Sequence, residues 1–313
     1  MLDGYTEGHP HQISGILLPH LYKLLCQLSS AGVHCIFVFD GPEHAAHKYK
    51  KRLVHTTMLP LIKAFGYDVH MARNEAEADL AAMNKHGIVE AILTEDSDAL
   101  VFGTPKIMRF IPNERRSDTD TAVDIYTMST IRRTCNITQD GFVLFTLLVG
   151  RDSADGIPGM NAETALALIE SGMFNTLVAD YARIRTSPTR LAIYRQTLRD
   201  RLSQELNLNR LGYLPTSLPA AAKALREADF PSTKRLETIL APITSWSGEF
   251  RSRNAVAWRA RLPDLEEISC ICKQDIGWRN EQELLRKFHS TLWPGLVLRM
   301  LISVCTVYTI CEY

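Results

Sequence analysis

The sequence predicts an α/β protein built on a parallel sheet with flanking helices, and three observations carry this prediction. Two short apolar runs, residues 35–39 and 88–93, have the length and the turn-bounded pattern of strands buried on both faces. A segment with helical apolar spacing precedes the first run, and further helical segments separate the two runs. Strands that alternate with helices favour a parallel sheet with covering helices.

The first part of the chain follows this alternation. A leucine stripe over residues 17–28 predicts a helix, and the first strand comes after it and stops at a turn over residues 40–42. Helices are predicted over about residues 56–65 and 75–85. The second strand then ends in the acidic stretch 94–98.

The next part changes from strands to helices. Short strands are predicted over residues 106–111 and 122–126. Helices over residues 138–149 and 162–170 flank a loop, residues 150–159, that glycine and proline punctuate. The predicted order is helix, two tight turns, helix.

The signals are weaker after residue 187. Residues 211–220 are rich in turn formers, whereas residues 296–310 are almost all apolar and are interrupted by Arg299. This last run is shorter than the ~20 residues that span a bilayer, so we expect a buried helix or strand rather than a membrane anchor. A helix is expected over residues 189–206, with four arginines facing outward: Arg190, Arg195, Arg199 and Arg201.

Composition excludes little. The 313 residues contain 35 Lys and Arg and 35 Asp and Glu, so any affinity for nucleic acid must come from local patches. No secretory signal is recognised at the N-terminus. The seven cysteines show neither paired spacing nor an even count, which argues against a disulfide framework or a zinc site and favours a reducing compartment.

Carboxylates gather where the predicted sheet would have its reactive edge. In open α/β sheets that edge lies beyond the carboxyl ends of the strands. Strand ends, the start of the second helix between the strands, and the glycine loop each supply acidic residues. They are Asp40, Glu75, Glu77, Asp96, Asp98 and Asp152.

Such a cluster needs a counter-charge. Carboxylates a few ångströms apart repel one another, whereas divalent cations neutralise them, and oxygen ligands favour magnesium or manganese over zinc. Two such ions about 4 Å apart can activate a water and stabilise the leaving oxygen of a phosphodiester.

Each motif also has a purely structural interpretation. Asn74 and Glu77 fit a helix capping box, residues 94–98 fit a cap for the following helix, and Asp152 fits a turn. Taken singly, these structural roles are favoured. Their joint occurrence at strand ends favours a metal site instead.

Four motifs together resemble the flap-endonuclease/XPG superfamily in order and spacing. They are FVFDGP at 37–42, NEAEA at 74–78, LTEDSDALVFG at 93–103 and VGRD at 149–152. The short interval between the first two motifs, and the phrase FGY at 65–67, look most like the fungal GEN/Yen branch of Holliday-junction resolvases. The resemblance implies a PIN-like 5′-nuclease sheet followed by a helix-two-turn-helix DNA-binding region.

The resemblance also implies roles for particular residues. By motif position, all six carboxylates would be ligands of two Mg²⁺ ions, directly or through water, and Mn²⁺ would substitute. Gly156 and Gly159 would present backbone groups to DNA phosphates, with K⁺ as a bridge. Three basic residues would approach the scissile phosphate, although without the acidic motifs they would be interpreted as a solvated helix face. They are Lys48, Lys51 and Arg52.

The sequence departs from the resembled family in places. It starts after the family's glycine-led first strand and its aspartate, so an N-terminally truncated core is expected. Ser153 stands at a usual tyrosine and Asn161 at a usual glycine, which would loosen the loop. The expected domains are a nuclease core over residues 1–135, the helix-two-turn-helix region over 136–210, and a C-terminal region of unassigned role over 211–313.

The leading hypothesis is therefore a magnesium-dependent nuclease that hydrolyses DNA at 5′ flaps or Holliday junctions in repair or recombination. Its implied partner is branched DNA, and a dimer on junction DNA is left open. No membrane partner is implied, and the implied location is the nucleus. One alternative is a catalytically impaired pseudo-nuclease that only binds DNA junctions. A related PIN-like ribonuclease is a third hypothesis, which the predicted helix-two-turn-helix region disfavours.

Overall fold

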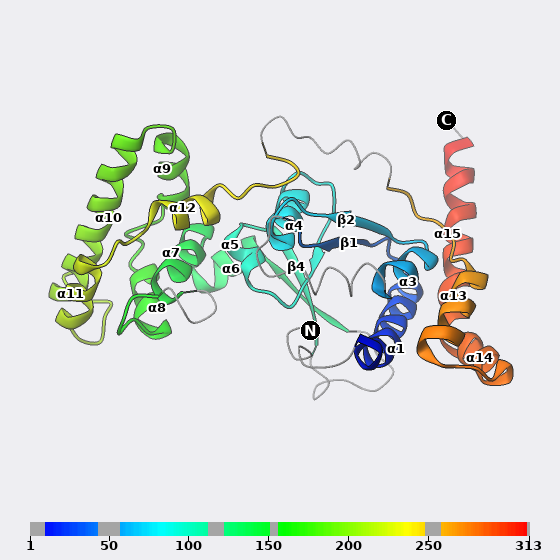
Figure 1. Ribbon diagram of the computed structural model, residues 1–313. Helices are drawn as coiled ribbons and strands as arrows, with labels where there is room; N and C mark the ends of the chain where they lie inside the picture. The colour runs from blue at the N-terminus through cyan, green and yellow to red at the C-terminus, as the bar shows by residue number, and fades with distance from the viewer. Residues whose placement is uncertain (1–9, 43–56, 112–121, 151–155, 248–257, 312–313) are drawn as a thin grey trace. The chain divides into compact units, whose positions relative to one another are not determined.

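The computed structural model describes residues 10–42, 57–111, 122–150, 156–247 and 258–311 (Figure 1). It divides the chain into two compact units. The first unit combines Met1–Ala76 with Arg251–Tyr313, and the second is Glu77–Phe250. The first unit is therefore made of two stretches that are far apart in sequence. The functional division predicted at residues 135 and 210 is a different partition, and it stays a prediction.

The first unit holds a small parallel sheet. Strand β1 (Ile36–Phe39) pairs with β2 (Asp68–Met71), with Ile36 opposite Asp68 and Phe39 opposite Met71. The connection between them includes α3 (Leu59–Ala64), as a parallel pair requires a crossover. The other helices and π-turns of this unit are α1 (Pro10–Ser30), α13 (Leu265–Ile271), η4 (Cys272–Ile276), α14 (Glu281–Lys287), η5 (Phe288–Leu292) and α15 (Trp293–Cys311).

The C-terminal helices of this unit pack on α1. Gly295 in α15 makes a close approach possible, because an added Cβ would lie within 3.0 Å of the Ser29 side chain. Tyr22 of α1 is buried among three aromatic rings, with centroids 5.7 Å away at Phe65, 5.0 Å at Trp278 and 6.3 Å at Phe288. Residues from both stretches of the chain thus form one core.

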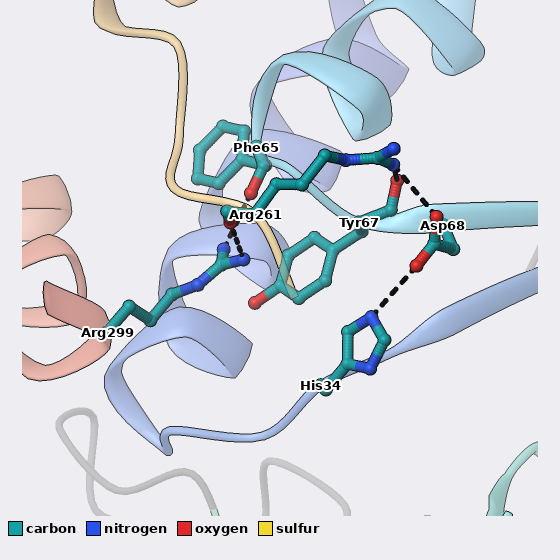
Figure 2. Close-up of polar contacts among 6 residues, drawn as sticks. All are labelled: His34, Phe65, Tyr67, Asp68, Arg261 and Arg299. Atoms are coloured by element: carbon teal, nitrogen blue, oxygen red, sulfur yellow. Dashed lines mark hydrogen bonds and ion pairs between the residues drawn. The ribbon is translucent and has the colours of Figure 1, made fainter. Parts of the chain in front are cut away.

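A partly buried polar network joins α15 to β2 (Figure 2). Arg299 donates to the carbonyl oxygen of Phe65 at 2.6 Å and to that of Arg261, and its guanidinium lies 4.7 Å from the Tyr67 ring centroid. The Arg261 guanidinium in turn lies 2.8 Å from Asp68, whose other oxygen is 3.0 Å from His34. Burial lowers the pKa of Arg299.

The second unit begins with a three-stranded sheet. Its order is β3 (Ile92–Leu93), β4 (Lys106–Phe110), β5 (Val123–Thr127). The β3–β4 pair is parallel and the β4–β5 pair is antiparallel, with Lys106 opposite Thr127. Helix α4 (Ala76–Lys85), nearly all of which lies in this unit, and α5 (Asp98–Val101) flank β3 in sequence, and Ile92, Ala99 and Ile107 form a small core cluster.

The rest of the second unit is helical. Its described helices are α6 (Met128–Cys135), α7 (Gln139–Val149), α8 (Ala162–Glu170), α9 (Leu177–Ile184), α10 (Pro188–Leu208), α11 (Pro219–Glu227) and α12 (Thr233–Leu240). The main core of the unit contains fully buried leucines from α7 and α10, such as Leu147 and Leu202, together with Leu236 and Ile239 of α12. The side-chain oxygens of four residues cap α7, α8, α10 and α12: Thr138, Asn161, Ser187 and Ser232.

The α/β fold class predicted from the sequence is confirmed, with several corrections to its elements. The run 88–93 forms a strand only at Ile92–Leu93, because Gly87 ends α4 in a left-handed turn and the next residues complete that turn. Strand β1 is half-buried rather than buried on both faces, since β2 is its one partner among the described strands. Strand β2 was not predicted at all.

Two predictions about helices also need correction. The C-terminal apolar run is a helix, but Val297, Met300 and Leu301 are exposed, so only one side of it is buried. In α10, Arg190 and Arg201 are exposed as expected, although Arg201 also donates to the carbonyl of Met173 at 3.0 Å. Arg195 and Arg199 are half-buried and donate to the carbonyl oxygens of Pro231 and Ala228. Within the described residues, no helix is both long and apolar enough to cross a bilayer.

Candidate functional site

In the first unit, Asp40 joins the end of β1 to the start of α4. Its Oδ1 accepts the backbone N–H of Ala76 at 2.9 Å, and the N–H of Gly41 donates to the carbonyl of Asn74 at 2.7 Å. Asp40, the residue after β1, thus supplies a cap to α4, where a capping box by Asn74 and Glu77 was an alternative from the sequence. The helix N-terminus also favours the negative charge of Glu75 and Glu77.

In the second unit, the acidic stretch after β3 is a closed turn. Thr94 Oγ1 accepts the N–H of Asp96 at 3.0 Å, and Asp96 Oδ1 accepts the N–H of Asp98 at 2.8 Å. These bonds fix Asp96 just before α5 and Asp98 as its first residue. Asp96 is exposed and Asp98 is half-buried. Of the helix cap considered from the sequence, the structure shows the bond from Asp96 to the first N–H of α5, whereas Ser97 at the N-cap position makes no side-chain capping bond.

Two residues that the sequence did not single out hold this turn to β4. The carboxylate of Glu95 accepts the N–H of Phe110 at 3.2 Å, and Arg109 donates to the carbonyl of Glu95 at 2.7 Å. The backbone N–H of Thr94 also donates to Met108 at 3.2 Å. The only signal in the sequence was the position of Glu95 inside the acidic motif, because its partners lie on another strand.

The glycine loop closes on the end of α7. The N–H of Ile157 donates to the carbonyl of Leu148 at 2.9 Å, and an added Cβ at Gly156 would lie within 3.0 Å of the Val149 carbonyl. Gly159 has a φ of +81°, which favours glycine. Asn161 has a φ of −105° and accepts the N–H of Thr164 at 2.8 Å, so it caps α8 in a backbone conformation that does not require glycine. Loosening of the loop stays a prediction.

The structure places the predicted metal ligands in separate parts of the chain. Asp40 and Glu75 belong to the first unit, whereas Glu77, Asp96 and Asp98 belong to the second. Among the described residues, no group of three or more His, Cys, Asp or Glu side chains has the geometry of a metal site. Convergence of the carboxylates stays a prediction. Four further site residues lie outside the described residues: Lys48, Lys51, Arg52 and Asp152.

The donor set nevertheless suits a hard cation. All six predicted ligands are carboxylates, and none is a cysteine or histidine, which favours magnesium or manganese over zinc. A carboxylate has about four acceptor positions on its two oxygens. The backbone bonds to Asp40 and Asp96 orient these side chains.

Comparisons with known proteins point to one group of nucleases. The family model described as XPG I-region matches residues 66–152. Flap endonuclease 1 of Chlamydomonas reinhardtii is 34% identical over 136 residues, which are 42% of this chain and 34% of that protein. Flap endonuclease 1-B of Physcomitrium patens is 35% identical over 138 residues. This chain covers 38% of its length, so it spans little more than a third of either relative.

Solved structures match over more of the chain. The junction-resolving enzyme GEN-1 with caesium has a TM-score of 0.72 at 26% identity, and the match covers 90% of this chain and 65% of that one. GEN1 in complex with product DNA and Mg²⁺ has a TM-score of 0.69 at 26% identity, covering 91% and 66%. The catalytic core of Rad2 with DNA substrate, at 20% identity and a TM-score of 0.58, shares the fold.

Fold and sequence are both similar to those of one class of protein. The α/β fold and the matched XPG I-region resemble those of the flap-endonuclease/XPG superfamily, as the four sequence motifs predicted. Among the solved structures, the chain resembles the Holliday-junction-resolving enzyme GEN1.

Proposed function

We propose that this chain is a magnesium-dependent, structure-selective DNA endonuclease that cuts 5′ flaps or four-way junctions. The observation that carries the proposal is the placement of Asp40 directly after β1, and of Asp96 and Asp98 directly after β3, in the motif order of the XPG group. Likeness to a GEN1 structure that holds product DNA and Mg²⁺ supports it. Branched DNA is the proposed partner, and the nucleus is the proposed location.

The proposed chemistry assigns a task to each set of residues. The six carboxylates, Asp152 included, would hold two Mg²⁺ ions, which activate water and stabilise the leaving oxygen of a phosphodiester when bound. Lys48, Lys51 and Arg52 would offset the charge that develops on the phosphoryl oxygens. Backbone groups around Gly156 and Gly159 would hold the duplex through its phosphates, with K⁺ as a bridge. GEN-1 structures with potassium and with caesium support a monovalent ion as part of the proposed site, although their likeness does not give its position.

The first test is incision of labelled 5′-flap and four-way-junction DNA with Mg²⁺ and with chelator. We expect incision with Mg²⁺ and none with chelator. Asp96→Asn keeps an acceptor for the Asp98 N–H but loses the charge, so it should lower the incision rate by at least about 100-fold, the scale of losing one electrostatic contact to a reaction centre. Its thermal unfolding midpoint should stay close to that of the original chain.

A matched substitution shows whether charge loss alone has this effect. Asp264 caps α13 by accepting the N–H of Glu267 at 3.0 Å, so Asp264→Asn makes the same chemical change at a helix start with no proposed role in the reaction. It should leave the incision rate unchanged. Junction binding without Mg²⁺-dependent incision would contradict the endonuclease and favour a pseudo-nuclease that binds junctions. Preferential cleavage of RNA would favour the ribonuclease hypothesis.

A further inference from the structure

Helix α4 carries a buried carboxylate that bonds to a distant part of the second unit. Asp79 has no exposed surface and lies on α4, two residues after Glu77. Its Oδ1 accepts the backbone N–H of Ser245 at 2.9 Å, and its Oδ2 accepts the Ser245 hydroxyl at 2.7 Å. We name this pair of bonds the Asp79–Ser245 clasp. The two residues are 166 positions apart in the sequence.

The two hydrogen bonds of the clasp restrain Ser245 strongly. A carboxylate taken out of water is costly unless it is hydrogen-bonded, and bonds to an ionised acceptor are about twice as strong as neutral ones. Both oxygens of Asp79 are satisfied by one residue, which fixes the position and the orientation of Ser245. A sliding or rotated arrangement would lose at least one of the two bonds.

Ser245 sits in a short turn that is itself closed. The Ser247 hydroxyl accepts the N–H of Thr244 and donates to the carbonyl of Thr244, both at 2.9 Å. The N–H of Trp246 donates to Thr244 Oγ1 at 3.2 Å. Thr244 and Ser245 are buried. The turn therefore transmits the position of Ser245 to the chain before it.

That chain leads directly to the helices beside the glycine loop. Only three residues, one of them Pro242, separate the end of α12 at Leu240 from Thr244. Leu236 and Ile239 of α12 are buried in the core that contains α7. Arg235 donates to the carbonyl of Thr146 at 2.6 Å, in the last turn of α7. A continuous series of contacts thus runs from α4 through the clasp and α12 to the end of α7.

We propose that the Asp79–Ser245 clasp sets which phosphodiester is cut. It rests on the proposed function, in which Glu77 on α4 belongs to the reaction centre and the glycine loop after α7 holds the duplex. The clasp fixes the spacing between these two elements, so it fixes how far along the strand the reaction centre lies from the held duplex. Asp79 and Ser245 are positioning residues, since both are buried and would act through the elements they hold.

Loosening the clasp should therefore change where the DNA is cut as well as how fast. Ser245→Ala loses the hydroxyl bond and keeps the backbone bond, whereas Asp79→Ala loses both. Misplacement of about 1 Å can slow a reaction about 100-fold, so each variant should incise the principal site roughly 10- to 100-fold more slowly in single turnovers. Incision should spread to neighbouring phosphodiesters, more with Asp79→Ala than with Ser245→Ala. Asp79→Asn can accept the N–H and donate to the Ser245 hydroxyl, so it should restore a single position.

The matched control removes an equivalent bond elsewhere in the same unit. Ser203 on α10 is buried, and its hydroxyl donates to the carbonyl of Ala222 at 2.9 Å. Ser203→Ala should lower stability about as much as Ser245→Ala and leave the incision position unchanged. A spread with Ser203→Ala as large as with Ser245→Ala would show that the spread follows from lost stability, and it would overturn the proposal.

The experiment maps incision positions at nucleotide resolution on a junction labelled on each strand. Hydrogen exchange of residues 241–247 is measured alongside, and it should be faster in both clasp variants. If Ser245→Ala folds and shows faster exchange but keeps the original incision positions, the role of the clasp is overturned and the proposed function is not. Absence of Mg²⁺-dependent incision by the original chain would overturn the proposed function, and this inference with it.

Discussion

At the residue scale, Gly41 occupies a position that no larger residue fits. It follows Asp40 and donates its N–H to Asn74. An added Cβ would lie within 3.0 Å of the carbonyl oxygens of Ala72 and Arg73, which are backbone atoms and cannot turn away as a side chain would. Glycine is thus required by the approach of two chain segments, and the position of Asp40 depends on it.

Gly41→Ala should therefore lower the free energy of unfolding by about 1–3 kcal/mol, the usual cost of overpacking. Gly87→Ala is the control, because nothing lies within 4 Å of its added Cβ and only its φ of +68° opposes the change. That variant should lose about 1 kcal/mol. Urea denaturation measures both. A smaller loss for Gly41→Ala than for Gly87→Ala would mean that the chain at residues 72 and 73 moves apart easily.

Single residues also show which features of the site can be predicted from the sequence. Asp40 and Asp96 were predicted at strand ends because an apolar run and a following turn are local signals, and the structure confirms both positions. Their use as backbone acceptors was predictable for Asp96, whose partner is two residues away, but not for Asp40, whose partner is 36 residues away. The partner of Asp79 is farther still, so nothing local could indicate it.

At the element scale, strand β2 shows why a strand can be missed. Its buried residues, Asp68 and His70, are polar, and its apolar residues, Val69 and Met71, are only half-buried, so the strand lacks the continuous apolar run that marked β1. Asp68 is satisfied by Arg261 and His34, and the His70 ring lies 5.7 Å from that of Trp258. Two of these partners belong to the C-terminal stretch. The strand is defined by residues almost 200 positions away.

Helix α15 depends on one residue in a comparable way. Arg299 is buried within a largely apolar helix, and its two bonds to the carbonyls of Phe65 and Arg261 attach α15 to the loop before β2 and to the segment before α13 (Figure 2). Arg299→Met keeps much of the side-chain volume but leaves both carbonyl oxygens without this donor. The bond to Phe65 is the buried one, and a buried group left unsatisfied costs about 1–3 kcal/mol, so the loss of unfolding free energy should be roughly 1–3 kcal/mol.

Arg279→Met is the matched control for this substitution. Arg279 is exposed and precedes α14, so the same change there should alter the unfolding free energy by less than about 0.5 kcal/mol. Chemical denaturation of both variants gives the comparison. Equal stability of the two variants would show that Arg299 contributes no more than packing.

At the scale of the whole molecule, composition and periodicity do not reveal which stretches of the chain form each of the two compact units. The first unit needs the C-terminal stretch, which supplies Trp278, Phe288 and Arg299 to a core begun by α1. The local pattern of the sequence predicted α1, α3, α4, α7, α8 and α10, because it is a property of neighbouring residues, but it missed shorter helices such as α6, α9, α11 and α12. It could not show which distant segments pack together, and for this reason the predicted boundaries at 135 and 210 divide the chain differently.

The two units should also respond differently to alkaline pH. Burial raises the pKa of Cys26 and of Cys35 to about 11, and that of Cys272 to about 12. Burial likewise raises the pKa of Tyr22 and Tyr67. All five groups lie in the first unit. In the second unit burial raises the pKa of Tyr194 to about 12, and among its described cysteines Cys135 is exposed.

The raised pKa values determine whether stability rises or falls with pH. A group whose pKa is raised by folding contributes stability that is complete below its unfolded pKa, near 9 for a thiol, and that is lost as the pH rises through the folded value. Each unit of pKa difference is worth roughly 1.4 kcal/mol. The first unit should therefore lose stability between pH 9 and about 11, ahead of the second unit.

Limited proteolysis at pH 8 and at pH 10.5, with the fragments identified by mass, tests this prediction. New cuts should appear first within residues 10–42, 57–76 and 258–311, and later within residues 77–247. Cys26→Ala removes one buried thiol and should move the onset of cleavage to higher pH, whereas Cys135→Ala removes an exposed thiol and should not. Simultaneous cleavage of both units at every pH, or an onset that Cys26→Ala leaves in place, would mean that the buried thiols of the first unit do not set its alkaline limit.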